Sequence, residues 1–182
     1  MSEENDAPPT EPAREADRYY GFLLFFMALA SVAAPLFAEA GLGWTLFLSG
    51  LIGGIWLVLD RTPRGYSAAV IWSVVAFALG VHLTFHVLLG LYPLQLIVGL
   101  GFLVMGIAIG VFGMTRYSHS PGARLALGLS GLVSGLFGVA VLLVGPNVPI
   151  WSGGTTLGLM FAAFGAALEI GAAQKRARLR AS

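Results

Sequence analysis

The sequence predicts an all-α membrane protein with six transmembrane helices arranged as three repeated helical hairpins. Of its 182 residues, 57% are hydrophobic and 10% are charged, and the mean hydropathy is +0.84. A soluble domain of this size could not bury so much apolar surface, so lipid must solvate most of it. A helix crosses the hydrocarbon core with about 20 apolar residues. Six apolar runs approach this length, at about 19–38, 42–59, 67–90, 94–114, 125–145 and 150–173.

Basic residues predict the orientation of these helices. All of them lie before the first run, after the second, between the fourth and fifth, or after the sixth: Arg14, Arg18, Arg61, Arg64, Arg116, Arg124, Lys175, Arg176, Arg178 and Arg180. With six spans these positions share one side of the membrane, whereas five or seven spans would distribute them over both. The positive-inside rule then predicts a multi-pass protein of the plasma membrane with both termini in the cytoplasm.

Aromatic residues near the ends of the runs agree with this topology. Tyr and Trp favour the membrane–water interfaces, where an apolar ring and a polar group are both accommodated. We expect interfacial positions for Tyr19, Tyr20, Trp44, Tyr66, Tyr92, Tyr117 and Trp151.

The two ends of the chain differ from its apolar middle. Residues 1–17 contain three prolines and six acids, and we expect a disordered cytoplasmic tail there. Residues 18–174 form the predicted six-helix transmembrane domain, and residues 175–182 form a basic cytoplasmic C-terminal tail. An acidic segment precedes the first run, where a signal peptide would have a basic one, so we expect no cleavage.

Glycine and proline recur at similar positions in the three predicted hairpins. The odd runs contain Gly21, Gly80 and Gly138, with Pro35, Pro93 and Pro149 near their outer ends. The even runs contain the pairs Gly43/Gly50, Gly99/Gly106 and Gly158/Gly165. Successive offsets are about 56 to 59 residues, which indicates an internal repeat whose register the sequence leaves open.

Glycines four residues apart predict faces on which two helices approach closely. In lipid, side-chain hydrophobicity supplies no driving force between helices, so small residues that bring backbones together take over this role. We expect most of these faces inside one protomer, with contacts between protomers as the alternative. The predicted helix-packing pairs are Gly50/Gly54, Gly106/Gly110, Gly131/Gly135 and Gly154/Gly158.

Three ionisable residues are candidates for a ligand or proton path. His82 and His86 lie four residues apart and would share a helix face, a spacing that could pass a proton or bind a metal. Glu169 is the only acid within an apolar run, and buried ionisable residues in membranes are functional candidates. The structural alternatives are imidazoles hydrogen-bonded to neighbouring helices and a carboxylate that reaches the cytoplasmic interface near Arg176.

Other classes of function lack the residues that they need. The chain has no cysteine, which excludes disulfides, thiolate metal sites and cysteine nucleophiles. It also lacks a Gly-x-Ser-x-Gly elbow, a phosphate-binding loop and paired carboxylates. With a net charge of +1 it has no basic nucleic-acid surface. The sequence therefore predicts no enzyme, no catalytic residue, no cofactor, no metal site and no nucleic-acid partner.

The repeated pattern resembles a known family. Segments 21–35, 80–93 and 138–149 each begin with Gly and end with Pro, and their partners surround Gly50, Gly106 and Gly165. In this they resemble the HdeD-like family of small bacterial inner-membrane proteins, over nearly everything after residue 18. The resemblance implies a stress-associated protein of the cell inner membrane, linked in that family to acid resistance, without a catalytic motif.

These observations lead to two expectations of function. The first is a non-enzymatic, HdeD-like membrane protein that acts through helix packing, with further copies of itself in a homo-oligomer, with the lipid bilayer or with a membrane-protein partner. The second is a small transporter or channel that uses His82, His86 and Glu169, because repeat-built transporters place their sites between repeats.

Cysteine labelling tests the predicted orientation. A Cys introduced at Gly41 should react with a membrane-impermeant maleimide added outside intact cells, whereas a Cys at Thr62 should react only after permeabilisation. The chain has no native cysteine, so each label reports one position. The opposite labelling pattern would show that the positive-inside argument gives the wrong orientation.

Overall fold

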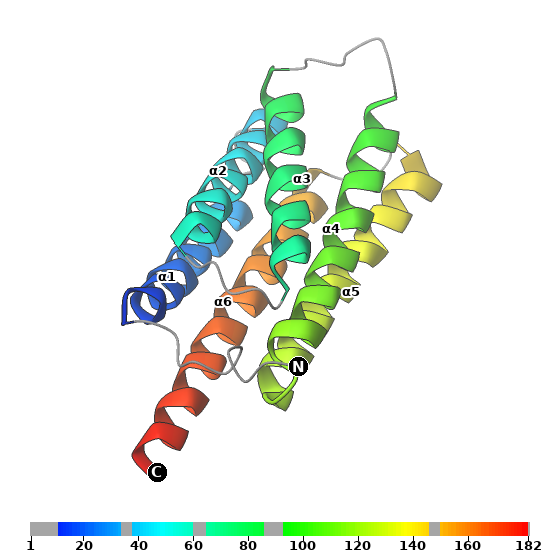
Figure 1. Cartoon of the computed structure of the whole chain (residues 1–182). Coiled ribbons are helices and arrows are strands. Elements are labelled where there is room, and N and C mark those ends of the chain that lie inside the picture. Colours follow the sequence, from blue (N-terminus) through cyan, green and yellow to red (C-terminus); the bar gives the residue numbers. More distant parts are fainter. Residues whose placement is uncertain (1–10, 34–37, 60–64, 86–92, 146–149, 182) are drawn as a thin grey trace.

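The computed structural model describes residues 11–33, 38–59, 65–85, 93–145 and 150–181. Over these ranges the chain is all-helical, as the sequence predicted, and contains no strand. Six helices are present (Figure 1): α1 (Glu11–Ala33), α2 (Ala38–Leu59), α3 (Tyr66–Phe85), α4 (Leu94–Arg116), α5 (Pro121–Val144) and α6 (Ile150–Ala181). Five contain segments long and apolar enough to cross a membrane: Gly41–Leu59, Tyr66–Phe85, Leu94–Arg116, Pro121–Val144 and Ser152–Gly171.

Helix α1 differs from the other five. Its apolar part, Tyr19–Ala33, is shorter than theirs and rises about 22 Å, against a hydrocarbon core of about 30 Å. The predicted first span, at about 19–38, continues into residues 34–37, which lie outside the described residues.

Both terminal helices extend into segments that the sequence assigned to tails. Helix α1 begins at Glu11 and so includes residues 11–17. Pro12 is compatible with this start because the first N–H groups of a helix have no partner within it. Helix α6 continues to Ala181 through most of the basic segment 175–182. Residues 1–10 lie outside the described residues.

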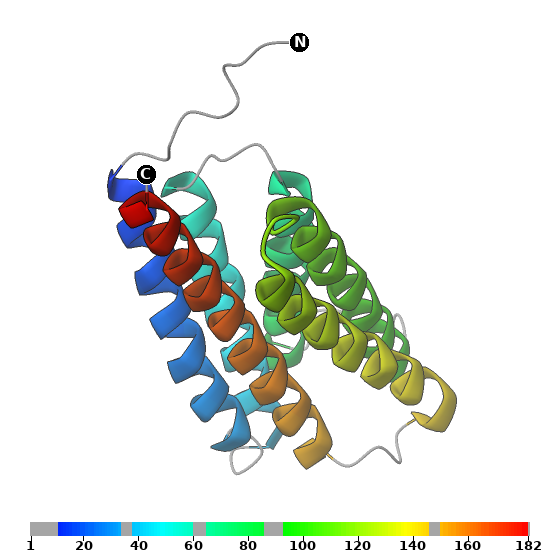
Figure 2. The same ribbon diagram turned by 90° about the horizontal axis from the view of Figure 1, so that it is seen from below.

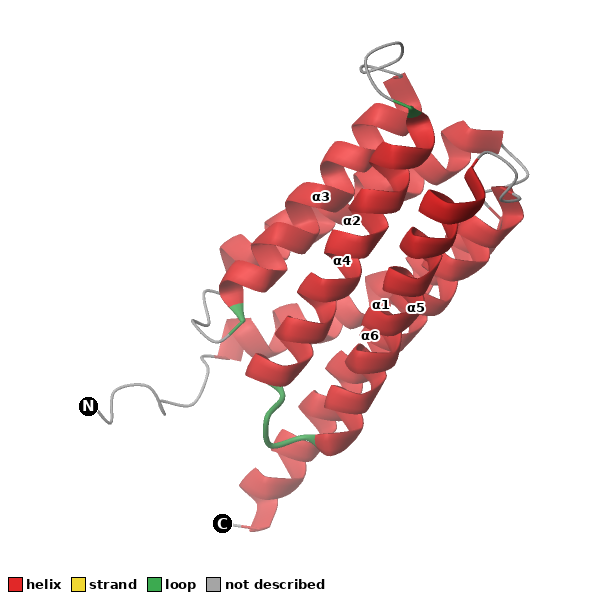
Figure 3. Ribbon diagram, turned by 90° about the vertical axis from the view of Figure 1, so that its right-hand side faces the viewer, coloured by secondary structure: helices red, strands yellow, loops and turns green. Residues whose placement is uncertain are grey.

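The helices form a ring in chain order, and α6 closes it by packing against α1 (Figure 2). Helices α4 and α5 are joined by the short connection 117–120 (Figure 3), which makes them antiparallel neighbours. The start of α1 and the end of α6 lie at the same end of the bundle (Figure 1). The most extensive contacts join α2 to α3, α4 to α5, and α6 to α1. The predicted hairpins, α1–α2, α3–α4 and α5–α6, are in contact but are not the closest pairs.

Five aromatic side chains, each from a different helix, meet in the interior. We call Tyr20 (α1), Trp56 (α2), Trp72 (α3), Phe112 (α4) and Phe164 (α6) the aromatic layer; all five are buried. Phe164 is central, with ring centroids 6.0 Å from Tyr20, 5.4 Å from Trp72 and 5.6 Å from Phe112. Tyr20 also stacks on Trp56 at 4.9 Å. Edge-to-face and offset-stacked rings attract one another beyond the area that they bury, so this layer holds five helices together.

Tyr20 corrects one expectation from the sequence. It was placed at the membrane interface, but only 2% of it is exposed, because it points toward the bundle axis. Its neighbour Tyr19 is exposed and points outward. Position near the end of an apolar run therefore did not distinguish an interfacial tyrosine from a core one.

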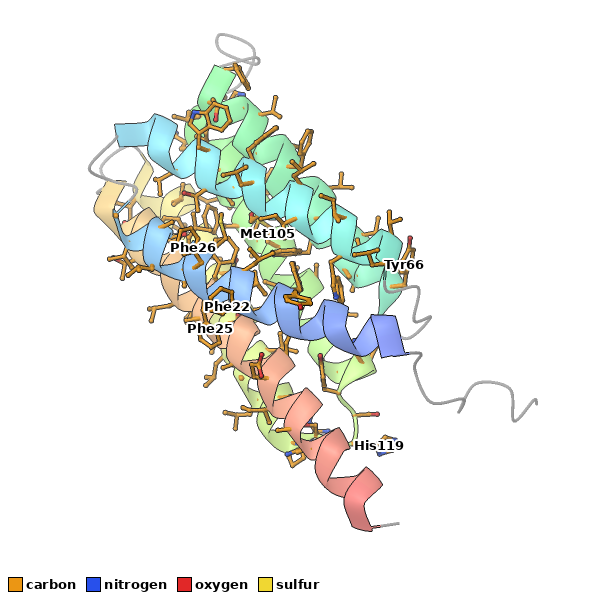
Figure 4. The ribbon with its side chains drawn as sticks, turned by 90° about the vertical axis from the view of Figure 1, so that its left-hand side faces the viewer. Phe22, Phe25, Phe26, Tyr66, Met105 and His119 are labelled. Carbon is orange, nitrogen blue, oxygen red and sulfur yellow. The ribbon has the colours of Figure 1, made fainter. Side chains whose placement is uncertain are left out.

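The outer surface of the bundle is apolar. Phe22 is 70% exposed on the outer side of α1, whereas Met105 is completely buried inside the bundle (Figure 4). Exposed leucine, valine, isoleucine and phenylalanine occur on all of the first five helices and at Leu159 of α6. A continuous apolar exterior of this kind matches lipid as the surrounding solvent, not water.

A matched pair of phenylalanine variants tests the aromatic layer. Phe112→Ala should lower the free energy of unfolding by about 3 kcal/mol, because it leaves a cavity among packed rings. Phe22→Ala removes the same atoms from the exposed side of α1 and should cost much less. Denaturant titration of the purified protein in detergent measures both. Equal losses for the two variants would argue against a packed interior at this level.

Candidate functional site

The closest backbone contacts lie along the line where α4 packs against α5, here called the α4/α5 seam. A Cβ atom placed on Gly106 would lie 2.5 Å from the carbonyl oxygen of Gly131. One placed on Gly138 would lie 2.6 Å from the carbonyl oxygen of Gly99. Real Cβ atoms do not approach so closely, so these positions accept only glycine without movement of a helix. The Ser134 hydroxyl also crosses the seam and donates a hydrogen bond to the backbone carbonyl of Phe102, at 2.8 Å.

A second seam joins α2 to α3. Gly50 lies against the backbone of Phe77, and a Cβ on it would also lie 2.7 Å from the carbonyl oxygen of Ser73. Gly80 of α3 lies against the backbone of Phe47. These contacts are again with main-chain atoms, which cannot rotate out of the way as a side chain can.

The third seam joins α6 to α1 and is looser. A Cβ on Gly165 would lie 3.0 Å from the carbonyl oxygen of Gly21, and one on Gly158 would lie 3.1 Å from that of Ala28. A methyl group on Gly165 therefore needs shifts of only a few tenths of an ångström. One on Gly158 would also meet the Val32 side chain, whose Cγ2 lies 2.9 Å from that Cβ position and would have to move.

The three seams share one geometry. In each seam, two glycines seven residues apart on the even helix contact four positions of the odd helix, which follow the spacing i, i+4, i+7 and i+11. The second glycine (Gly50, Gly106 or Gly165) contacts positions i and i+4, and the first (Gly43, Gly99 or Gly158) contacts position i+11. Gly99 and Gly158 also contact position i+7, whereas the residue at i+7 in α3 contacts Phe47. These positions are Ser73, Phe77, Gly80 and Thr84 in α3, Gly131, Gly135, Gly138 and Leu142 in α5, and Gly21, Phe25, Ala28 and Val32 in α1.

This geometry differs from the register read off the sequence. The sequence aligned Gly21 with Gly80 and Gly138. In the seams, Gly21 instead corresponds to Gly131, and Ala28 takes the place of Gly80 and Gly138. The reason is physical: the looser third seam accommodates the methyl group of an alanine, so the small residue there need not be a glycine.

The predicted glycine pairs differ in what lies in the direction of their Cβ positions. Four of the eight residues contact a neighbouring helix of the same protomer through their Cβ direction: Gly50, Gly106, Gly131 and Gly158. Three have no atom within 4 Å in that direction: Gly54, Gly110 and Gly135. Gly154 is buried in α6. Gly110 and Gly135 still line the α4/α5 seam through their backbone atoms, which a Cβ on Gly131 or Gly106 would meet.

The structure does not bring His82 and Glu169 together. His82 is buried near the end of α3, with 4% of it exposed. Glu169 is partly buried on α6, where its Oε1 lies 3.4 Å from the Cβ position of Gly21. His86 lies outside the described residues. Within those residues, no group of three His, Asp or Glu side chains could bind a metal ion.

The aromatic layer lies between His82 and Glu169. Trp72 and Phe164 are in ring contact, which sets the level of the layer on α3 and α6. His82 follows Trp72 by ten residues, and Glu169 follows Phe164 by five on a helix that runs the opposite way. At 1.5 Å per residue, the two candidates are separated by about 20 Å along the bundle axis. Their roles as a ligand or proton path remain predictions.

Several hydroxyl groups of the bundle donate hydrogen bonds to backbone carbonyls. The Ser31 hydroxyl donates to the carbonyl oxygen of Met27, four residues earlier on the same helix, at 2.7 Å. The Ser130 hydroxyl reaches the carbonyl oxygen of Met160 on α6 at 3.1 Å. Such bonds satisfy polar groups that lipid cannot hydrate.

Arg116 contacts the aromatic layer, and the sequence reasoning missed this contact. It was placed with the other basic residues of the cytoplasmic loops, but its guanidinium lies 5.2 Å from the ring centre of Trp56 and 5.8 Å from that of Phe112. These are cation–π distances. The sequence carries no signal for this contact, because Arg116 ends an apolar run like any interfacial arginine.

Comparison of the chain with protein-family models, with curated proteins and with solved structures gave no match in any of the three. The resemblance to the HdeD-like family is therefore carried by the glycine and proline pattern of the sequence.

Two alanine variants on α4 test the α4/α5 seam. Gly106→Ala should lower the free energy of unfolding by about 1–3 kcal/mol, because the new methyl group meets backbone atoms of α5. Gly110→Ala, one turn further on, has open space at Cβ and should be neutral or stabilising by up to about 1 kcal/mol. Thermal denaturation in detergent measures the difference. A Gly106→Ala protein as stable as Gly110→Ala would contradict the seam.

Proposed function

We propose that this is a non-enzymatic integral membrane protein that acts through helix packing, with itself, with lipid or with a membrane partner. The observation that carries the proposal is the filled interior of the bundle. Met105, Leu157 and Met160 are completely buried along its axis, and the aromatic layer adds five rings. Over the described residues, a bundle packed in this way offers surfaces and seams for interaction.

The position of the basic residues supports a cytoplasmic location for both ends of the chain. Arg116 ends α4 and Arg124 lies in the first turn of α5, at the same end as the start of α1 and the basic end of α6. The positive-inside rule assigns this end to the cytoplasm. Helix α1 packs along α6 from Gly21 to Val32, which supports α1 as a membrane-spanning helix in addition to the other five.

We also propose that the ring is a threefold repeat of one helix pair. The shared seam geometry supports it, with α2/α3 and α4/α5 as two copies and α6/α1 as the third. The third copy joins the two ends of the chain, so the repeat unit in space is an even helix followed by an odd one. Three related pairs are what the resemblance to the HdeD-like family implies, and a role in acid stress comes from that resemblance alone.

One observation favours the alternative, a small transporter or channel that uses His82, His86 and Glu169. His82 is buried within an apolar helix, where an ionisable side chain is costly and is often functional. The aromatic layer weighs against a continuous path between His82 and Glu169, because five packed rings would have to move to open it.

Proton flux in liposomes separates the two functions. Under an imposed pH gradient, the purified protein should give no dye signal above that of empty liposomes. The His82→Ala and His86→Ala variants should behave in the same way, because neither residue serves transport in the proposed function. A flux that is present in the natural protein and lost in either variant would replace this proposal by the transporter.

A further inference from the structure

An apolar groove runs along the outer side of the α4/α5 seam. Its volume is about 740 Å³. Gly110 and Gly128 lie along it and have no atom within 4 Å in the Cβ direction, so they leave the floor of the groove open. Ile107, Leu132 and Leu136 line it as larger side chains, and all three are exposed. The groove therefore opens sideways, toward the lipid.

The dimensions of the groove suit a hydrocarbon chain. It extends along α5 from Arg124 to Leu136 and beyond, which is about 18 Å or more of helix. Half of a hydrocarbon core measures about 15 Å. The groove is therefore long enough to hold the whole acyl chain of a lipid in one leaflet.

Positive charge is concentrated at one end of the groove. Arg124 lines that end and is exposed. Pro121 also lines it and is the first residue of α5, so the positive end of the helix dipole points to the same place. The other arginine of this connection, Arg116, is instead held over Trp56. The groove thus combines a long apolar surface with a cationic end at the depth of the lipid phosphates.

We propose that this groove binds an anionic phospholipid of the cytoplasmic leaflet, with an acyl chain between α4 and α5 and the phosphate at Arg124. The inference rests on the proposed function in that it takes these helices to be membrane-spanning and the basic end to be cytoplasmic. It goes further by naming the lipid class and the residues that select it.

A second copy of the chain is the competing occupant, and charge argues against it. Two copies inserted in the same orientation would bring their Arg124 side chains to the same depth on either side of a twofold interface. The two positive charges would repel each other, whereas Arg124 attracts a lipid phosphate at the same position.

Native mass spectrometry of the detergent-purified protein tests the lipid site. The protein is mixed with phosphatidylglycerol or phosphatidylcholine of identical chains, and the fraction that retains a lipid is compared. Retention should favour phosphatidylglycerol by roughly fivefold, the effect expected of one arginine near an anionic headgroup. Arg124→Gln should abolish this preference, and Gly128→Leu, which fills the floor, should reduce retention of both lipids.

Two variants serve as matched controls. Gly54→Leu adds the same side chain at another glycine with open space, on α2 and outside the groove. Arg180→Gln removes the same charge near the end of α6. Both should retain phosphatidylglycerol as the natural protein does, and thermal denaturation of all four variants confirms that they are folded.

Several outcomes would overturn the site. These are equal retention of the two lipids, an unchanged preference in Arg124→Gln, and loss of retention in Gly54→Leu as well as Gly128→Leu. A dimer that disappears in Gly128→Leu without any lipid preference would assign the groove to a second copy. The proposed function fails separately, through proton flux in liposomes, so the two results are distinguishable.

Discussion

The whole arrangement depends on backbone-to-backbone contact between helices. In lipid, side chains gain nothing by leaving a solvent as apolar as themselves, so two helices associate by packing closely. Each atom contact contributes little, and the number of contacts rises steeply as the axes approach. At Gly106 and Gly131, the two backbones are so close that no side chain fits between them. This contact sets the angle and the vertical register of α4 and α5, which then act as one rigid unit.

Three such units have to close a ring, and this determines what fills the interior. When α6 packs on α1 through Gly165, the ring closes around a centre that large buried side chains occupy. The aromatic layer fills it near the basic end, and Arg116 lies over two of its rings. Close packing of the helices at the seams thus goes together with a densely packed centre. They leave the outer surface as the place where other molecules can bind.

The sequence predicted the elements of this fold better than their partners. Apolar run length and the one-sided arginines identify the helices because both follow directly from the thickness and polarity of a bilayer. The sequence also identified seam glycines, but it aligned Gly21 with Gly138, whereas in the seams Gly21 corresponds to Gly131. Ala28 was overlooked, since the requirement is a small residue and the required size depends on a separation that only the folded ring sets.

The aromatic layer could not be predicted for a related reason. Tyr20 and Tyr19 are adjacent and alike in the sequence, but only Tyr20 points to the bundle axis. Direction around a membrane helix is poorly encoded in hydropathy, because the lipid-facing and the core-facing sides are both apolar.

The glycines on the outside of the bundle show why a groove, and not glycine itself, indicates a binding site. Glycine lowers helix stability by up to about 1 kcal/mol relative to alanine, so Gly54, Gly110 and Gly128, which no neighbouring helix requires, all carry this cost. Gly54 shows that an open glycine alone identifies nothing. Gly110 and Gly128 differ because they lie in the same groove, between larger apolar walls, with Arg124 at its end. Shape, polarity and charge then point to one ligand, a chain of hydrocarbon that carries a negative headgroup.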